Sequence, residues 1–242
     1  MQLYFIRHGQ SANNRLWDAT SSEEGRVEDP ELTEAGQQQA KLVAQFLAQH
    51  QGDAPTTNGF NGFNDFQLTH LYASPMVRAL DTAQPISEAL DLPIFVWEEI
   101  HEQGGIWSQD ETTGQPLGRA GRKRTEFASR FPTCQLPDYF DENGWWNRPV
   151  EDHETTLDRA RRFVTQLQER HGNTDDSVAI VSHGAFYNYL LGALLNIPIN
   201  YPESSIWFVL HNTGITRFDF LTTHLRIAYS NRVDFLPANL IT

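Results

Sequence analysis

Arg7 and His8 stand side by side directly behind a short apolar run, and Gly9 follows them. Arginine is a permanent cation whose planar fork fits phosphate oxygens, and each such hydrogen bond contributes about 1.5–3 kcal/mol. A histidine with an ordinary pKa of about 6.5 presents a neutral ring nitrogen near physiological pH, which can attack phosphorus. Taken alone, the pair is more typical of a solvated strand end, because so short a motif often arises by chance.

The same residue types recur behind other apolar runs of the chain. Arg78 follows a second run, a group of carboxylates follows a third, and His183 and Gly184 follow a fourth. Because the carboxyl ends of parallel strands gather ligands at one edge of an open α/β sheet, we expect these side chains to meet. Gly9 and Gly184 would allow a ligand to approach the backbone closely. The recurrence therefore predicts an anion site that contains a nucleophilic histidine.

The elements that must position these residues alternate along the chain. Runs typical of strands cover residues 3–6, 70–74, 93–99, 177–182, 205–212, 215–221 and 226–230. Patterns typical of helices cover residues 32–50, 76–90, 154–170 and 186–196. We expect Thr33 to cap the first of these helices and Pro85 to kink the second. The alternation predicts an α/β fold, a three-layer α/β/α sandwich whose mainly parallel sheet has an antiparallel end formed by the last three strands.

Three stretches interrupt this alternation. Residues 16–31 are an acidic, turn-rich predicted loop, and residues 52–65 are a Gly/Asn-rich connector. Residues 103–150 contain two adjacent tryptophans, which we expect to pack within this segment, the alternative being part of an apolar substrate wall. A basic run at residues 119–124 is typical of a solvated face, and its alternative role is to bind a second anionic group of the substrate. An insertion of this size is often a lid. We therefore expect a single domain over residues 1–242 with a loop-rich lid.

Composition limits the partners of the chain. The formal net charge of −13 makes nucleic acid and anionic membrane surfaces poor partners, whereas a small phosphorylated substrate can still bind in a local positive pocket. No apolar run approaches the roughly 20 residues that span a bilayer, so we expect a cytoplasmic protein. The single cysteine, Cys134, excludes an intramolecular disulfide and a thiolate metal cluster. The sequence contains no heptad pattern, so it predicts no oligomeric state.

Four motifs of this chain closely resemble those of the histidine phosphatase superfamily, the group that includes phosphoglycerate mutases and many acid phosphatases. They are RHGQSANN at residues 7–14, LTEAGQQQA at 32–40, SPMVRALDTA at 74–83 and VSHGAF at 181–186. They stand in the order of the family. The resemblance implies that His8 becomes transiently phosphorylated while Arg7, Arg78 and His183 hold the transferred phosphoryl group. It also implies that catalysis needs no metal and no cofactor.

The resemblance extends to smaller contacts around the phosphate. Asn14 occupies the place of a family asparagine near the bound phosphate, and Gly184 belongs to the second histidine motif, so both are expected to bind phosphate. Gln10 and Ser11 occupy neighbouring motif positions and are predicted substrate contacts. Capping of a loop explains Asn14, Gln10 and Ser11 equally well.

The proton donor is predicted to be a glutamate, since the leaving alcohol needs a proton. The family places a glutamate behind a strand in the pattern Leu-x-Glu, and Ile100-His101-Glu102 matches it. Glu99 fits a different alignment and is the alternative, otherwise a substrate contact. We favour Glu102, and expect His101 to lie at the rim of the pocket.

These residues predict a metal-independent phosphomonoester hydrolase that works through a phosphohistidine. The first alternative is a phosphoglycerate mutase-type transfer, which returns the phosphate to a bound intermediate and needs a primer. Residues 15–31 do not resemble the substrate-enclosing segment of those mutases, and residues 103–124 do not match their long glutamate motif. The second alternative is a non-catalytic binding module that retains the fold, although every central motif residue is present.

Overall fold

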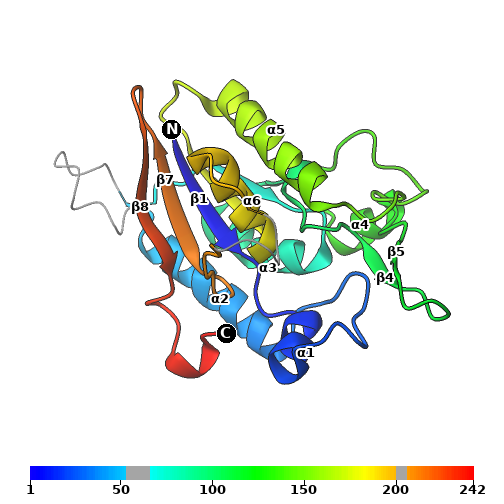
Figure 1. The fold of residues 1–242 in the computed structure, drawn as a ribbon. Coiled ribbons are helices and arrows are strands. Elements are labelled where there is room, and N and C mark those ends of the chain that lie inside the picture. Colours follow the sequence, from blue (N-terminus) through cyan, green and yellow to red (C-terminus); the bar gives the residue numbers. More distant parts are fainter. Residues whose placement is uncertain (53–65, 200–205) are drawn as a thin grey trace.

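The computed structural model describes residues 1–52, 66–199 and 206–242 and contains a six-stranded sheet (Figure 1). Its strands are β1 (Gln2–Arg7), β2 (His70–Ala73), β3 (Ile94–Val96), β6 (Ser177–Ser182), β7 (Ile215–Phe220) and β8 (Leu225–Arg232). The long helices are α2 (Glu34–Gln49), α3 (Val77–Leu90), α5 (His153–His171) and α6 (Gly184–Leu195). The remaining elements are α1 (Ala12–Thr20), β4 (Trp107–Gln109), β5 (Pro116–Gly118), α4 (Arg124–Arg130) and two 3₁₀ turns, Glu98–Ile100 and Ala238–Leu240.

The sheet has the strand order β3-β2-β6-β1-β7-β8. The four strands β3, β2, β6 and β1 are mutually parallel, whereas β7 and β8 add antiparallel pairs at one end. Parallel neighbours require crossover helices, and these helices cover both faces of the sheet. The predicted α/β sandwich with an antiparallel end is therefore confirmed.

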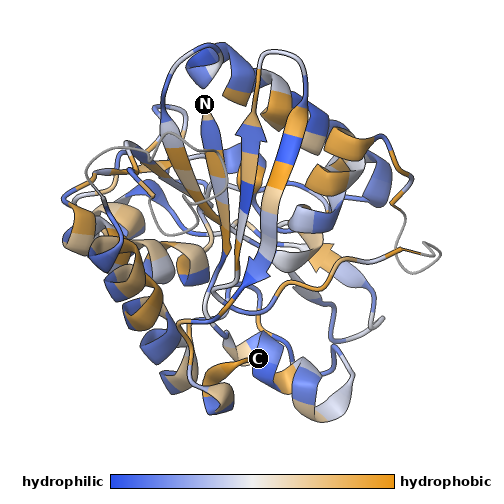
Figure 2. Ribbon diagram, turned by 90° about the vertical axis from the view of Figure 1, so that its left-hand side faces the viewer, coloured by the Kyte–Doolittle hydropathy of each residue, from blue (hydrophilic) through white to orange (hydrophobic). Residues whose placement is uncertain are grey.

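Two apolar cores separate the layers, because side chains alternate across each strand. On β1, Tyr4 and Ile6 join the core under α2 and α3, whereas Leu3 and Phe5 join the core under α5 and α6. The helices are accordingly striped with hydrophobic and hydrophilic residues (Figure 2). A strand buried on both faces reads as a continuous apolar run, which is why β1 and β6 could be predicted.

Capping residues fix the ends of the helices that flank the site. Thr33 is the N-cap of α2, as predicted, and its hydroxyl accepts a hydrogen bond from Gly36 N at 3.1 Å. Helix α3 runs through Pro85 to Leu90, so the proline does not end this helix.

Two local predictions were wrong. Residues 16–20 belong to helix α1 rather than to a loop, because Ser11 and Asn14 form a reciprocal capping box at its start. Residues 206–212 form no strand among the described residues. The backbone groups of these residues form hydrogen bonds with side chains instead. Asn188 donates to Phe208 O and accepts from Phe208 N, and Arg7 Nη1 donates to Leu210 O at 2.5 Å. The predicted connector at residues 52–65 lies almost wholly outside the described residues.

A close backbone approach joins the end of β1 to the start of α2. A Cβ added to Gly9 would lie 2.5 Å from the carbonyl oxygen of Gly36, and one added to Gly36 would lie 2.1 Å from that of Gln10. Both neighbours are backbone atoms and cannot rotate away. Gly9 therefore permits packing against α2, rather than the approach of a ligand that was expected.

Gly36→Ala is expected to destabilise the protein by about 1–3 kcal/mol, because the added methyl must push the segment after β1 away from α2. Urea unfolding would measure the loss, and any activity that depends on His8 should fall with it, because His8 lies in the displaced segment. Gln38→Ala, on the exposed side of the same helix, is the matched control and should change the stability little. An unchanged unfolding midpoint in Gly36→Ala would contradict the packing described.

Candidate active site

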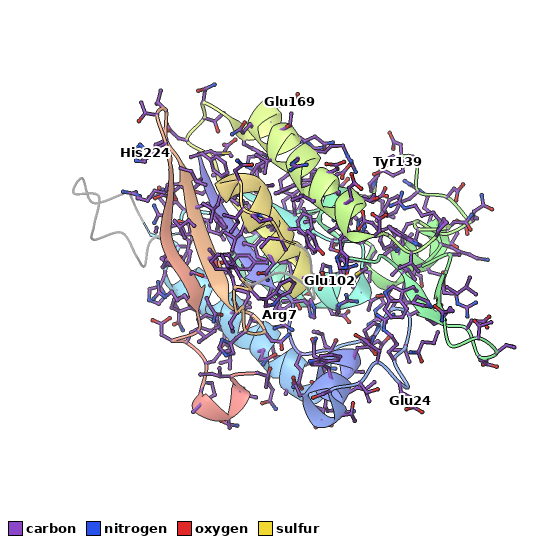
Figure 3. The ribbon with its side chains drawn as sticks, viewed as in Figure 1. Arg7, Glu24, Glu102, Tyr139, Glu169 and His224 are labelled. Atoms are coloured by element: carbon purple, nitrogen blue, oxygen red, sulfur yellow. The ribbon has the colours of Figure 1, made fainter. Side chains whose placement is uncertain are left out.

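The site lies at the carboxyl ends of the parallel strands. Arg7 ends β1 and pairs in register with Ser182, the last residue of β6, and His8 N donates to Ser182 O at 2.9 Å. Ser74 follows β2 on the other side of β6, and its backbone N–H donates to Val181 O at 3.0 Å. Figure 3 shows Arg7 at this edge, near the start of α6. Three neighbouring parallel strands therefore bring His8, His183 and Ser74 to one place.

His8 is buried and held in one tautomer by its two partners. Its Nδ1 lies 2.6 Å from Gly9 O, which can only accept, and Arg78 Nε, which can only donate, lies 3.2 Å from its Nε2. The proton must therefore be on Nδ1, and the lone pair on Nε2 faces the guanidinium. Burial, with Arg78 and then Arg7 nearby, holds the pKa of His8 well below its usual value. The ring is thus neutral at physiological pH, as a nucleophile requires.

Arg7 and Arg78 concentrate positive charge around this nitrogen. Burial lowers the pKa of each guanidinium, and Glu102 opposes that shift in both. Arg7 Nε is buried and has no hydrogen-bond partner among the described residues. Two buried guanidiniums with unused donor capacity beside one nucleophilic nitrogen form a site suited to a phosphate dianion.

His183 is the N-cap residue of α6 and lies against His8, with ring centroids 5.0 Å apart. Its Nε2 lies 2.7 Å from Ser74 Oγ, and its buried Nδ1 has no partner among the described residues. Burial, followed by the charge of Arg78, lowers its pKa well below the usual value. A Cβ on Gly184 would lie 3.4 Å from Arg7 Nε, which is ordinary contact, so the start of α6 packs directly on that guanidinium.

Thr82 is a positioning residue that the sequence did not indicate. It is fully buried on α3, and its hydroxyl accepts from Gly9 N at 3.0 Å while donating to Arg78 O at 2.7 Å. One side chain thus ties the backbone of the His8 segment to the backbone that carries Arg78. Its place one turn after Arg78 on the same helix face is the only sequence signal that could have found it.

The two candidate glutamates lie in different surroundings. Glu102 accepts hydrogen bonds from Phe186 N at 2.9 Å and Ala185 N at 3.3 Å, so its carboxylate sits on the amino end of α6 (Figure 3). Glu99 instead pairs with Arg162 at 3.4 Å, on the side of the 3₁₀ turn that faces α5. Of these two glutamates, only Glu102 acts electrostatically on Arg7 and Arg78.

The smaller motif residues are engaged in local hydrogen bonds. Asn14 Oδ1 accepts from Ser11 N and lies 3.3 Å from Asn212 Nδ2, which also donates to His8 O at 2.9 Å. Gln10 Oε1 accepts from the Thr33 hydroxyl at 2.8 Å. Asn14 and Ser11 thus cap α1 beside the His8 backbone, and their predicted contacts with phosphate or substrate, like that of Gln10, stay predictions.

A second charged group flanks Arg78 and was not foreseen. Asp29, from the acidic stretch after α1, accepts from Val77 N at 3.1 Å and lies 3.9 Å from Arg78 Nη1. Burial raises the pKa of Asp29 to about 6, against the opposing charge of Arg78. Arg122 Nε lies 3.6 Å from the same carboxylate. The basic run is therefore not a fully solvated face, because at least this arginine turns inward to the site.

The loop that carries Asp29 is fastened to residues 103–150. Arg26 stacks on the ring of Trp107, with its Cζ 3.3 Å from the centroid, and Nη1 donates to Trp107 O at 2.7 Å. Burial lowers the pKa of Arg26 to about 10, and the charges of Arg78 and Glu102 both act on it. The loop after α1 and the 103–150 segment thus meet beside the site.

His101 is fully buried, so its predicted place at the rim was wrong. Its Nδ1 lies 2.6 Å from Glu98 O, and its ring packs edge-on against Trp146. Trp146 is itself buried and packs edge-on against Trp145, which confirms that the two tryptophans pack within the 103–150 segment. Arg159 donates to His101 O at 2.9 Å and forms a buried ion pair with Glu151. This cluster holds the turn that precedes Glu102. It also explains why His101 is buried, which a single histidine in the sequence did not suggest.

The buried His101 makes a pH-dependent contribution to stability. Burial, assisted by Arg159, lowers its pKa to about 4. The unfolded chain binds the same proton near pH 6.5, so the free energy of unfolding falls as the pH drops from 7 toward 4. We expect His101 alone to account for a loss of about 2 kcal/mol between pH 7 and pH 5. Urea unfolding at both values, with His101→Gln beside the natural protein, measures it; an equal pH dependence in the two would contradict it.

These features define a class of protein: an α/β sandwich with paired arginines and histidines at the carboxyl edge of its parallel strands. The sequence pattern of the histidine phosphatase superfamily (branch 1) matches residues 3–232. The chain therefore belongs to that superfamily and is an enzyme of the histidine phosphatase type, which confirms the resemblance of the four motifs.

Among the described residues, none of the helices has both the length and the apolar character that a membrane span requires.

Similar proteins include several named phosphatases. Phosphoserine phosphatase 1 of Hydrogenobacter thermophilus is 26% identical over 201 residues, which cover 83% of this chain and 79% of that protein. Glucosyl-3-phosphoglycerate phosphatase of Mycolicibacterium vanbaalenii is 25% identical over 231 residues, covering 93% and 85% respectively. The crystal structure of a His-to-Ala mutant of a phosphoserine phosphatase from Entamoeba histolytica, in complex with phosphoserine, has a TM-score of 0.58 and 26% identity, covering 98% and 99%.

Proposed function

We propose that this enzyme hydrolyses small phosphomonoesters through a phosphohistidine on His8, without a metal. The observation that carries this proposal is the orientation of the His8 ring. Its protonated Nδ1 is fixed by Gly9 O, so the unprotonated Nε2 faces the Arg78 guanidinium where a phosphate would bind. A neutral, oriented imidazole inside a cationic pocket has the properties of a nucleophile for phosphorus.

In the first half-reaction the substrate phosphate takes the hydrogen bonds of Arg7 and Arg78, which frees His8 Nε2. This nitrogen attacks phosphorus and forms the P–N bond as the P–O bond to the alcohol breaks. The guanidiniums and His183 stabilise the charge on the equatorial oxygens. Glu102, in its protonated form, gives its proton to the leaving oxygen, so an alcohol departs.

In the second half-reaction water attacks the phosphohistidine. Glu102, now a carboxylate, accepts a proton from this water while the P–N bond breaks and its electron pair returns to His8 Nε2. Inorganic phosphate leaves, and the enzyme regains its starting protonation state. The hydrogen bonds from Ala185 and Phe186 support this role because they keep the carboxylate at one place in both steps.

The substrate class follows from the relatives and from the segments around the site. The similar proteins are named for phosphoserine and glucosyl-3-phosphoglycerate, which are small phosphorylated molecules. We extend this class to the present enzyme and assign recognition of the leaving group to residues 15–31 and to the lid at residues 103–150 of a single domain. The inward-facing Arg122 supports a substrate that carries a second anionic group.

The test is phosphate release from a panel of phosphomonoesters in the presence of chelator and without any bisphosphate. The panel pairs substrates with and without a carboxylate, such as phosphoserine and phosphoethanolamine. Turnover is expected, with the lower KM for the carboxylated member, and Arg122→Gln should narrow that difference. Two results together would contradict the hydrolase and support a mutase. No ester would release phosphate, and a phosphoglycerate would isomerise once a bisphosphate is added.

A further inference from the structure

A second constellation of polar residues lies at the opposite edge of the sheet. His70 begins β2, Asp176 directly precedes β6, and His171 is the last residue of α5. Because β2 and β6 are parallel neighbours, their amino ends meet at the edge away from His8. Figure 3 labels Glu169, close to His171 in the chain, at the end of α5 remote from Arg7 and Glu102. We propose that His70, His171 and Asp176 form a binding site for a transition-metal ion of the zinc type.

The geometry brings one ligand atom from each residue together. These three atoms all lie within 4.8 Å of one another. His171 Nδ1 lies 2.9 Å from one carboxylate oxygen of Asp176, and His70 Nδ1 lies 4.0 Å from the other. The two imidazole rings are packed edge to face, with centroids 4.6 Å apart. Small rotations of the partly exposed side chains of His70 and Asp176 would bring the ligand atoms to the distances of about 2.0–2.2 Å from a common ion that zinc requires.

The donor set selects the ion. Two imidazole nitrogens and one carboxylate oxygen suit zinc and its neighbours in the transition series, whereas magnesium and calcium prefer a shell of oxygens. Three protein ligands leave a fourth tetrahedral position for water. The ion takes the place of the hydrogen bond between His171 and Asp176, and it therefore binds more tightly as the pH rises and the imidazoles lose their protons.

The surroundings of His171 are those of a positioned ligand. Its Nε2 lies 3.0 Å from the hydroxyl of Tyr72, so this nitrogen is occupied and Nδ1 is directed toward Asp176. Such an outer hydrogen bond orients a metal-binding histidine and fixes its tautomer. His171 is almost fully buried, whereas the side chains of His70 and Asp176 are 34% and 27% exposed, which leaves a route from solvent.

An ion here would connect the start of β2 to the end of α5 and the start of β6, two neighbouring elements that lie far from β2 in the chain. It would stabilise the fold by mass action, because the unfolded chain does not hold the three ligands together. The site is remote from His8, so the inference is independent of the proposed hydrolase. The enzyme can therefore release phosphate in the presence of a chelator and still bind zinc at this separate site when the chelator is removed.

Isothermal titration calorimetry of the chelator-treated, full-length protein with zinc chloride is the test. We expect saturable binding of a single ion and an increase of the thermal midpoint by about 5 °C at saturating zinc. Magnesium chloride should produce neither effect. His70→Gln and Asp176→Asn should each abolish the saturable binding, and Tyr72→Phe should weaken it about tenfold.

Two controls locate the ion. His224→Gln removes an exposed histidine elsewhere on the surface and should leave the isotherm unchanged. His8→Ala should also bind zinc as the natural protein does. The proposal is overturned if zinc shows no saturable binding, if His70→Gln and Asp176→Asn bind it normally, or if His8→Ala is the variant that loses it. Circular dichroism of each variant without metal confirms that the fold is retained.

Discussion

His8→Ala is expected to reduce kcat for phosphate release by a factor on the order of 10⁴ or more, because in the proposed mechanism it removes the atom that forms the P–N bond. The two guanidiniums remain, so the variant should still bind the substrate. Loss of the ring also leaves Arg78 Nε without its partner at 3.2 Å. We therefore expect KM or the inhibition constant of inorganic phosphate to change far less than kcat.

The measurement is steady-state phosphate release in chelator, with phosphate inhibition and urea unfolding as companions. Unfolding should show that the variant is folded, so that the lost activity reports chemistry. Retention of more than about a hundredth of the natural kcat would exclude His8 as the essential nucleophile and would leave His183 as the residue to examine.

Glu102→Gln has the second-largest expected effect, a loss of about 10²–10⁴-fold in kcat, because glutamine keeps the shape but transfers no proton. The loss should depend on the leaving group. An alkyl phosphate needs protonation of its departing oxygen, whereas p-nitrophenyl phosphate releases a stabilised anion. We expect kcat/KM to fall strongly for the alkyl ester and only slightly for the nitrophenyl ester.

Glu99→Gln is the matched comparison, since Glu99 is the alternative proton donor. It pairs with Arg162 on a partly exposed surface, and such pairs are worth little. We expect less than about a threefold change in kcat/KM for either ester. If Glu99→Gln shows the leaving-group dependence and Glu102→Gln does not, the two assignments must be exchanged.

The sequence predicted the architecture well because chain connectivity and strand burial determine it. Continuous apolar runs at β1 and β6 indicated buried parallel strands, and helical periodicity between them indicated the crossovers. From these, the meeting of Arg7, Arg78 and His183 followed, since the carboxyl ends of parallel neighbours lie at one edge. The predicted and observed structures agree most closely at segments such as β1 and β6, where the local residue pattern and the overall fold favour the same element.

Contacts between distant segments could not be predicted in this way. The approach of Asp29 to Arg78, and the buried state of His101, depend on how irregular segments fold back over the site. Their hydrogen bonds follow no period along the chain. The strand expected at residues 205–212 failed for a related reason, because the side chain of Asn188 satisfies backbone groups that a neighbouring strand would otherwise bond.

The phosphohistidine itself is the most direct test of the account. The natural protein, in chelator, would be mixed with a ³²P-labelled phosphomonoester, quenched rapidly into alkaline detergent, and digested for mass spectrometry. The proposed mechanism predicts label that survives alkali, is lost in acid, lies on His8 and is absent from His8→Ala. Turnover without such label, or label on another residue that persists in His8→Ala, would contradict the phosphohistidine intermediate on His8.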